Sequence, residues 1–251
     1  MQKKIDLSVS DAHQFALYSD SSVVFGQKSD VVVVIQDESI VHRVVRVLKL
    51  RKGESFVIFN REQHVVVKIL ECTREKIDVL VITNNQNIQL RPRITFLLPL
   101  LKKEALEEAI YSLAELGIND VQLVVTEKSR ISLSKNDMQR LHKIVIVAAE
   151  QAKQYHFPEI YEIKSLQETI NDLSLNSDKI VFDMLGENFF ELHNKIVAKH
   201  IYLLIGPEGG LTKKELLIIK ERGFKGCLLT PTVLRALQAV AIGSALFRIR
   251  T

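Results

Sequence analysis

The sequence predicts an α/β protein of two domains, a small β-rich domain in residues 1–85 and a larger α/β domain in residues 86–251. Three observations lead to this prediction. Short apolar or alternating segments separated by polar turns fill residues 31–82, as is typical of β-strands. From residue 94 onward, segments of strand length alternate with segments of helical periodicity, which indicates a parallel sheet. An asparagine-rich polar passage, residues 83–92, separates the two patterns and is the predicted linker.

The strands of the first domain are predicted at residues 31–35, 54–59, 65–70 and 77–82. A helix is predicted over residues 41–52, because Val41, Val44, Val45 and Leu48 follow the spacing of one helical face. Its opposite side is basic and carries His42, Arg43, Arg46 and Lys49, extended by Arg51 and Lys52. Such a helix is either a solvated amphipathic helix or a surface that binds the phosphates of a nucleic acid.

The second domain alternates regularly. Strands are predicted at residues 94–100, 121–126, 179–184 and 200–205, and helices at residues 102–116, 136–154 and 187–196. The last quarter then adds a glycine-rich loop, a helix, a short strand, a proline-containing turn and a final helix. Thr212 stands three residues before Glu215, which is the spacing of a capping box, and Gly223 marks the end of that helix.

The glycine-rich loop comprises Gly206, Pro207, Gly209 and Gly210, and it directly follows an apolar strand. It is not a nucleotide-binding P-loop, because Leu211 follows its last glycine in place of a lysine. It also lacks the G-x-G-x-x-G pattern of dinucleotide-binding folds. From the residues alone, the loop is either a tight strand-to-helix turn or a place where main chain contacts a ligand.

A resemblance to a known family decides between these two interpretations. The segment 204–210, Leu-Ile-Gly-Pro-Glu-Gly-Gly, and the Leu-x-x-x-Val-Leu-Arg turn at residues 229–235 resemble the small-subunit ribosomal RNA methyltransferase E family, the uridine-N3 methyltransferases of the SPOUT, or trefoil-knot, class. Further matches are Lys102 followed by Glu-Leu-Gly at residues 115–117, Thr-Glu-Lys-Ser at residues 126–129, and Glu-Gln at residues 150–151 with Pro158 before the next strand. The resemblance spans roughly residues 30 to 250.

The resemblance implies a SPOUT trefoil-knot methyltransferase domain with a parallel sheet, preceded by a β-rich PUA-like barrel that binds RNA. It implies S-adenosylmethionine as cofactor and N3 of a uridine in 16S ribosomal RNA as methyl acceptor. The cofactor-binding residues would be Leu204, Ile205, Gly206, Pro207, Gly209, Gly210, Leu229, Thr230, Val233 and Leu234. The catalytic candidates would be Arg235, to stabilise negative charge on the base, followed by Glu208, Glu115 and Lys102.

The implied partners are small-subunit ribosomal RNA or the 30S subunit, and a second copy of the chain. A homodimer is expected because the final helix has more apolar residues than one packing face needs, namely Val240, Ala241, Ile242, Ala245, Leu246 and Phe247. The chain departs from the family pattern at residues 236–238, where Ala-Leu-Gln replaces the usual Thr-Glu-Thr. Three alternatives therefore stay open: a related methyltransferase with another RNA target, an RNA-binding protein that has lost catalysis, and an unrelated α/β enzyme.

Composition places limits on the function. A net charge of +4 is too small to indicate nucleic-acid binding by itself. No apolar run is long enough for a membrane span and no signal peptide is evident, so a cytoplasmic protein without a membrane partner is expected. Cys72 and Cys227 are isolated, and the histidines lack metal-ligand spacing, so neither a disulfide nor a metal site is expected.

Overall fold

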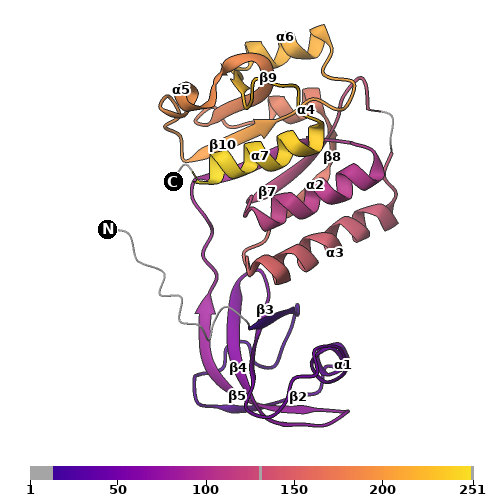
Figure 1. The fold of residues 1–251 in the computed structure, drawn as a ribbon, viewed down its shortest axis with the longest axis vertical. Coiled ribbons are helices and arrows are strands. Elements are labelled where there is room, and N and C mark those ends of the chain that lie inside the picture. Colours follow the sequence, from indigo (N-terminus) through magenta and orange to yellow (C-terminus); the bar gives the residue numbers. More distant parts are fainter. Residues whose placement is uncertain (1–13, 130–131, 250–251) are drawn as a thin grey trace. The chain divides into compact units, whose positions relative to one another are not determined.

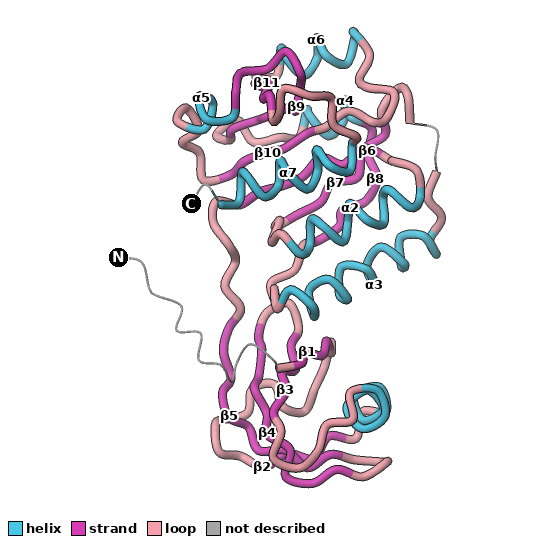
Figure 2. The backbone as a smooth tube through the Cα atoms, viewed as in Figure 1, coloured by secondary structure: helices cyan, strands magenta, loops and turns pink. Residues whose placement is uncertain are grey.

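A computed structural model describes residues 14–129 and 132–249 (Figure 1). The chain divides into two compact units, and the boundary lies between Ile88 and Gln89. The first unit is mainly β-sheet, and the second contains a parallel sheet with helices on both faces (Figure 2). Within the described residues, no helix is both long enough and apolar enough to cross a membrane.

The N-terminal unit is built on a mixed sheet. In the described residues its elements are β1 (Phe15–Tyr18), β2 (Val32–Ile35), α1 (Glu38–His42), the π-helix η1 (Arg43–Val47), β3 (Ser55–Phe59), β4 (Gln63–Cys72) and β5 (Ile77–Gln86). The strand order is β1-β3-β4-β5-β2, with β1 parallel to β3 and the other pairs antiparallel. No pairing joins β1 to β2 in the described residues, so the expected closed barrel stays a prediction.

The predicted linker is partly wrong, because residues 83–86 belong to β5. They pair with β4, and the last pair joins Gln63 to Gln86. Asparagine and glutamine are poor strand formers, so the pattern indicated a loop. Pairing with a neighbouring strand outweighs that local preference.

The predicted basic helix is shorter than expected. Asp37 begins it, since the Asp37 carboxylate accepts a hydrogen bond from the Ile40 amide at 2.9 Å. The chain then widens into η1, where the Leu48 amide donates to the Arg43 carbonyl at 2.8 Å, and Lys49 adopts the left-handed region with φ of 55°. The prediction of a helix to residue 52 is therefore wrong, because the backbone turns away at Lys49.

The C-terminal unit is an α/β layer structure. In the described residues its strands are β6 (Arg93–Pro99), β7 (Asp120–Val125), β8 (Glu159–Ser165), β9 (Asp178–Asn188), β10 (His200–Leu204) and β11 (Lys225–Leu228). Its helices are α2 (Lys103–Glu115), α3 (Lys135–Ala152), α4 (Leu166–Asn171), α5 (Phe189–His193), α6 (Lys213–Glu221) and α7 (Ala236–Ile249). The strands form one parallel sheet of order β11-β9-β10-β6-β7-β8.

Alternate residues of each strand pack on opposite faces of this sheet, as a buried parallel strand requires. Phe96 and Leu203 join the core under α2, α3, α5 and α7. Leu97 and Leu204 join a smaller core under α4 and α6. The near-continuous apolar runs of β6 and β10 are therefore explained by helices on both faces (Figure 1).

In the C-terminal unit, one predicted helix is much shorter than expected and one observed helix was not predicted. The helix predicted at residues 187–196 shrinks to α5, because β9 continues to Asn188 by pairing with β11. The short helix α4 was not predicted, although a capping box of Ser165 and Glu168 begins it. Strand pairing thus outweighs the helical periodicity at residues 187–188, whereas α4 has a local start signal of its own.

Candidate functional site

The candidate site lies at the carboxyl ends of the central parallel strands. The glycine-rich loop follows β10, the start of α2 follows β6, and the turn at residues 229–235 follows β11. Ligands of open α/β sheets bind outside this edge, because the loops that follow the strands converge there. Because each of these segments follows a strand of the same parallel sheet, all three lie at its carboxyl edge.

The glycine-rich loop needs glycine because of its own backbone. The Gly210 amide donates to the Pro207 carbonyl at 2.8 Å, and Gly210 has a φ of 67°, which residues other than glycine adopt at a cost. A Cβ at Gly206 would lie 3.2 Å from Gly210 Cα and from the Leu211 amide nitrogen. The tight turn by itself therefore favours glycine at both positions, as the first of the two interpretations of the sequence predicts.

Polar contacts fasten the loop to its neighbours. The Glu208 carboxylate accepts from the Lys102 amide at 3.2 Å, and the Lys128 ammonium donates to the Gly209 carbonyl at 2.6 Å. The buried carboxylate of Glu215 accepts from the Thr212 amide at 2.8 Å and from the Glu127 amide at 2.9 Å. The turn at residues 126–129, recognised in the sequence as a motif, therefore supports the loop and the start of α6.

Strand β9 makes an excursion beside this loop. Gly226 pairs with Val181, but the next residue of β11, Cys227, pairs with Glu187, so residues 182–186 leave the ladder. The two strands meet again tightly, because a Cβ at Gly186 would lie 2.4 Å from the Cys227 amide nitrogen. The excursion brings residues 182–184 toward the loop.

These segments enclose an open cavity of about 800 Å³, and a smaller cavity of about 100 Å³ adjoins it. Of the predicted cofactor-binding residues, the larger cavity is lined by Ile205, Gly206, Pro207, Gly210, Val233 and Leu234. Leu229 and Thr230 line the smaller cavity. Leu204 packs instead into the core under α4 and α6, and Gly209 contacts Lys128.

The catalytic candidates are not all at this cavity. Lys102, Glu208 and Arg235 line it, and the Arg235 side chain is exposed. Glu115 does not, because it ends α2, and a helix of this length spans roughly 20 Å from the end near Lys102. The structure therefore brings three of the four candidates together and leaves Glu115 apart.

Sequence reasoning missed several residues of the lining, namely Glu104, Ala105 and Glu108 on α2 and Phe182, Asp183 and Met184 on β9. The two glutamates carried a signal, since a spacing of four residues puts both on one side of a helix. The β9 residues carried none, because their position depends on how a distant strand pairs. Among the described residues, no group of three or more His, Cys, Asp or Glu side chains is arranged to hold a metal ion.

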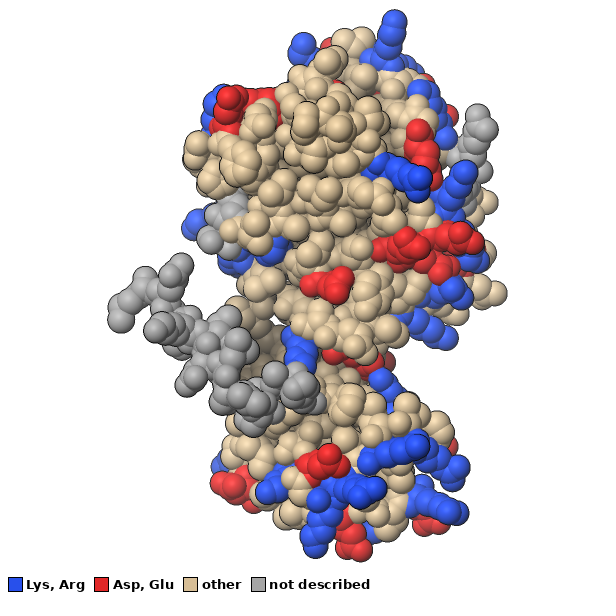
Figure 3. All heavy atoms as spheres, viewed as in Figure 1, with Lys and Arg blue, Asp and Glu red and all other residues tan. Residues whose placement is uncertain are grey.

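The N-terminal unit carries a separate open cavity of about 780 Å³ beside α1 and η1. His42, Arg43 and Arg46 line it, together with Arg74 from the turn between β4 and β5. Glu38 and Glu75 also line it, and Figure 3 shows basic side chains gathered over this part of the unit. Lys49, Arg51 and Lys52 do not line the cavity and follow the turn that ends η1.

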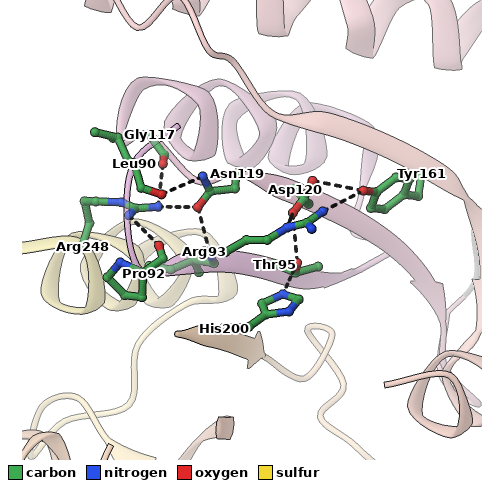
Figure 4. Close-up of polar contacts among 11 residues, drawn as sticks. Leu90, Pro92, Arg93, Thr95, Gly117, Asn119, Asp120, Tyr161, His200 and Arg248 are labelled. Carbon is green, nitrogen blue, oxygen red and sulfur yellow. Dashed lines mark hydrogen bonds and ion pairs between the residues drawn. The ribbon is translucent and has the colours of Figure 1, made fainter. Parts of the chain in front are cut away.

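A polar network occupies the opposite edge of the parallel sheet, at the amino ends of its strands (Figure 4). The buried Asp120 carboxylate accepts from Arg93 at 2.7 Å, from Thr95 at 3.2 Å and from Tyr161 at 3.1 Å. Thr95 has one hydroxyl proton and donates it to Asp120, so at 2.9 Å it accepts from Nε2 of His200. Burial, with a further contribution from the Arg93 charge, lowers the pKa of His200.

Arg248 of α7 forms a second part of this edge (Figure 4). Its guanidinium donates to the Pro92 carbonyl at 2.9 Å, the Gly117 carbonyl at 2.7 Å and the Asn119 side chain at 2.8 Å. Burial lowers the pKa of Arg248 to about 10, which still leaves it cationic at neutral pH. The end of α7 that lies away from the cavity is thereby fixed.

A protein-family model described as an RNA methyltransferase domain matches residues 89–247, which is more than half of the chain. The chain belongs to this family. The matched segment contains the glycine-rich loop, the turn at residues 229–235 and the cavity between them. The resemblance to RNA methyltransferases that the sequence indicated is thereby confirmed.

Relatives of this RNA methyltransferase carry the name expected from the sequence. The ribosomal RNA small subunit methyltransferase E of Synechocystis sp. is 27% identical over 81% of this chain and 69% of its own length. The protein of the same name from Buchnera aphidicola is 27% identical over 83% of this chain and 87% of its own length.

Solved structures share the fold of most of the chain. A ribosomal RNA small subunit methyltransferase E from Neisseria gonorrhoeae, bound to S-adenosylmethionine, is 21% identical and superposes with a TM-score of 0.81 over 94% of this chain and 98% of its own. A protein of Legionella pneumophila, solved in complex with the same cofactor, is 20% identical, with a TM-score of 0.77 over 94% of this chain and 97% of its own. The α/β fold with one mixed and one parallel sheet is thus that of known methyltransferases.

Proposed function

We propose that this chain is an S-adenosylmethionine-dependent methyltransferase that methylates N3 of a uridine in small-subunit (16S) ribosomal RNA. One observation carries the proposal. In a domain of the RNA methyltransferase family, the glycine-rich loop and the turn at residues 229–235 line one open cavity at the carboxyl edge of a parallel sheet. The name shared by the relatives supports the specific substrate.

The cavity fits the cofactor. Its volume of about 800 Å³ lies within the range of small-molecule sites. Ile205, Val233 and Leu234 offer apolar contacts for an adenine ring, and Gly206 and Gly210 expose main-chain groups without side-chain bulk. When bound, S-adenosylmethionine supplies a methyl group activated by a positively charged sulfur.

Residues of this chain would act on the uridine as follows. The N3 atom carries a proton at neutral pH, so the base becomes a good nucleophile only when that proton is lost. The exposed guanidinium of Arg235, at the start of α7, would stabilise the uridine anion or hold a neighbouring phosphate. Lys102 lines the same cavity as a second cation. Glu208 is better suited to positioning, because its carboxylate already binds the Lys102 amide at the start of α2.

Contacts with RNA outside the cavity would come from the N-terminal unit. His42, Arg43 and Arg46 line a cavity there with Arg74, and Lys49, Arg51 and Lys52 follow along the chain. Clustered arginine and lysine are the expected footprint of phosphate binding. Small-subunit ribosomal RNA, free or in the 30S subunit, is the proposed partner.

A homodimer through α7 is part of the proposal. Val240 and Phe247 are buried within their own unit, so they do not contribute to the surface as the sequence suggested. Ala241, Ile242 and Ala245 stay partly exposed, and Figure 3 shows uncharged atoms over α7. Light scattering at micromolar concentration should show twice the mass of 28.6 kDa, and a monomer would contradict the dimer. The trefoil knot stays a prediction of the resemblance.

The activity is tested on ribosomal RNA. Mass spectrometry of nucleosides from small-subunit RNA should show loss of 3-methyluridine in a strain lacking the gene and recovery with the parental gene. Arg235→Ala should fail to restore it, whereas Glu115→Ala should restore it because Glu115 lies away from the cavity. Equal 3-methyluridine in both strains would overturn the proposed reaction.

The RNA-binding surface is tested by salt dependence. Replacing Arg43, Arg46 and Lys49 together by glutamine should weaken binding of all RNA sequences and lower the salt slope by roughly one unit for each phosphate that is no longer bound. Affinity for S-adenosylmethionine should not change, because its proposed site lies in the other unit. If the triple variant binds RNA with the parental affinity and salt slope, the RNA-binding surface lies elsewhere, and Arg91, Arg93, Lys102 and Lys103 are the next candidates.

One observation favours a second candidate, an RNA-binding protein of this fold with weakened or lost catalysis. Ala236, Leu237 and Gln238, which replace the polar residues usual in the family, all line the cavity. Purified protein that binds 30S subunits and S-adenosylmethionine but transfers no methyl group would support this candidate. Transfer to another RNA would instead support a different target.

A further inference from the structure

The ionisable lining of the larger cavity is acidic. Among the described residues, it contains two cations, Lys102 and Arg235, and four carboxylates, those of Glu104, Glu108, Asp183 and Glu208. The formal charge of this lining is therefore negative, although the chain as a whole carries +4. A cavity of this sign favours a cationic ligand over an anionic one.

Two of these carboxylates stand on α2 and have no partner in the part of the chain that the structure describes. Glu104 and Glu108 are four residues apart, so they lie on the same side of the helix. In the described part of the chain, neither carboxylate takes part in a hydrogen bond or ion pair. Glu107 differs, because it binds Arg140 of α3 through two contacts at 2.6 and 2.7 Å. On α2, the glutamate that faces α3 is therefore paired, whereas the two glutamates at the cavity are not paired with any described residue.

The third carboxylate comes from the excursion of β9. Asp183 is half-buried and lines both cavities. Its Oδ1 accepts a hydrogen bond from the Leu185 amide at 2.9 Å, which fixes the side chain. Glu104, Glu108 and Asp183 therefore present negative charge to the cavity from two separate elements.

The structure assigns to Glu104, Glu108 and Asp183 the recognition of the positive charge of the methyl donor, and with it the distinction between the donor and its demethylated product. This inference rests on the proposed function. The donor carries a positively charged sulfur, whereas S-adenosylhomocysteine has a neutral thioether and is otherwise the same molecule. Nearby carboxylates attract the first more strongly than the second. They also repel RNA phosphates, which leaves Lys102 and Arg235 as the cavity residues suited to RNA.

The test compares the two ligands on neutralised variants. Calorimetry would give the dissociation constants of S-adenosylmethionine and S-adenosylhomocysteine for the parental protein and for the combined variant Glu104→Gln, Glu108→Gln, Asp183→Asn. Because partly exposed charges interact weakly, the preference for the donor should fall by roughly three- to tenfold. The combined variant should bind S-adenosylhomocysteine with the parental affinity. Raising the salt concentration should weaken the preference for the donor over its product in the parental protein but not in the variant.

Glu107→Gln is the matched control, since it removes the same charge from the same helix outside the cavity, and its ligand preference should equal the parental one. If the combined variant fails to fold, Glu104→Gln and Glu108→Gln apply the same test separately, because both side chains are exposed. An unchanged preference, or equal weakening of both ligands, would overturn this inference and leave the cofactor site in place. A parental protein that binds neither ligand would overturn the proposed function as well.

Discussion

The two edges of the parallel sheet differ in how they are held. At the amino edge, Asp120 and Arg248 each make three hydrogen bonds to other described residues, and these tie together separate strands and a helix (Figure 4). At the carboxyl edge, the glycine-rich loop is fastened by single contacts of Glu208 and Lys128. The amino edge has the features of a structural anchor, and the carboxyl edge has those of a ligand site.

This difference has a physical basis. Buried polar groups that are hydrogen-bonded to several elements fix a unique arrangement, since a shift would break these bonds. Loops at the other edge must admit a ligand, so their stability is drawn from fewer contacts. Helix α7 connects the two edges, because Arg248 fixes one end while Ala236 at its other end lines the cavity. Substitutions at the amino edge should therefore change stability, and those at the carboxyl edge should change binding.

The largest effect is expected from Arg248→Met. The substitution removes the hydrogen bonds to Pro92, Gly117 and Asn119 and leaves the two carbonyls without this donor, which should lower the free energy of unfolding by about 3 kcal/mol. Arg248→Lys keeps the charge but cannot reach three acceptors. Its stability should therefore lie between that of the parental protein and that of Arg248→Met. Urea unfolding measures both. If Arg248→Met lowers the free energy of unfolding by less than about 1 kcal/mol, Arg248 is not a structural anchor of the amino edge.

A smaller decrease is expected from Asp178→Ala at the start of β9. The Asp178 carboxylate accepts from the Val197 amide at 3.0 Å and the Ala198 amide at 2.9 Å, and it pairs with Lys225 at 3.3 Å. Burial favours a higher pKa, but these amides and Lys225 outweigh it and lower the pKa of Asp178. Its removal should cost about 2 kcal/mol of folding stability at pH 7.

The pH dependence of that decrease follows from the sign of the shift. A carboxylate with a lowered pKa stabilises the fold above the ordinary value of 3.8, and the contribution disappears as the pH falls through the folded pKa. The difference between parental protein and Asp178→Ala should therefore shrink below pH ~4. Lys225→Met should cost much less, because the ammonium is partly exposed. A constant difference from pH 7 to 3 would assign the decrease to packing.

The carboxyl edge should respond in binding. In Gly206→Ala the new Cβ lies 3.2 Å from loop backbone, so the loop must shift, and affinity for S-adenosylmethionine should fall by roughly tenfold, or about 1.4 kcal/mol. Gly210→Ala meets no atom within 4 Å but is strained by its positive φ, at a cost of about 1 kcal/mol. Calorimetry and urea unfolding together separate the effects. A Gly206→Ala protein with lower stability and parental affinity would contradict the proposed division.

The sequence predicted the carboxyl edge better than the amino edge, and the reason is locality. The glycine-rich loop and its capping box lie within ten residues of one another, and α6 begins after Thr212 as predicted. Members of the amino-edge network are far apart in the sequence: Arg93 and Tyr161 by 68 residues, Thr95 and His200 by 105. No local pattern indicates that such residues meet.

The wrong predictions have the same cause. The periodicity of residues 41–52 assumed α-helical turns, but η1 is wider and Lys49 leaves the helix, so the basic residues do not form one continuous face. The excursion at residues 182–186 exists only because Cys227 of β11 pairs with Glu187. Both cases depend on tertiary contacts that outweigh local preference. The predicted alternation of strands and helices in the C-terminal unit was confirmed. Strands covered by helices on both faces are apolar along their whole length, so this pattern is visible in the sequence itself.

The smallest effect expected is the pH response of His200, and it isolates one member of the amino edge. Groups facing this half-buried ring are Arg93 on β6, Asp120 on β7 and Tyr202 on its own strand. The pKa of His200 is lowered from 6.5, first by burial and then by Arg93, with Asp120 acting in the opposite direction. An unfolded chain therefore binds the proton at a higher pH than the folded chain, so folding stability falls as the pH drops below 6.5.

His200→Gln tests this response, because a glutamine amide can still donate to Thr95 but does not titrate. The variant should match the parental melting temperature near pH 8. Between pH 7 and pH 5 it should lose less stability than the parental protein. The difference between the two losses should be less than about 1 kcal/mol, because the ring is partly solvated. Melting curves across this range measure the difference directly. Parallel curves would show that His200 is protonated as easily in the folded chain as in the unfolded one, and the amino edge would then be an anchor without a titrating member.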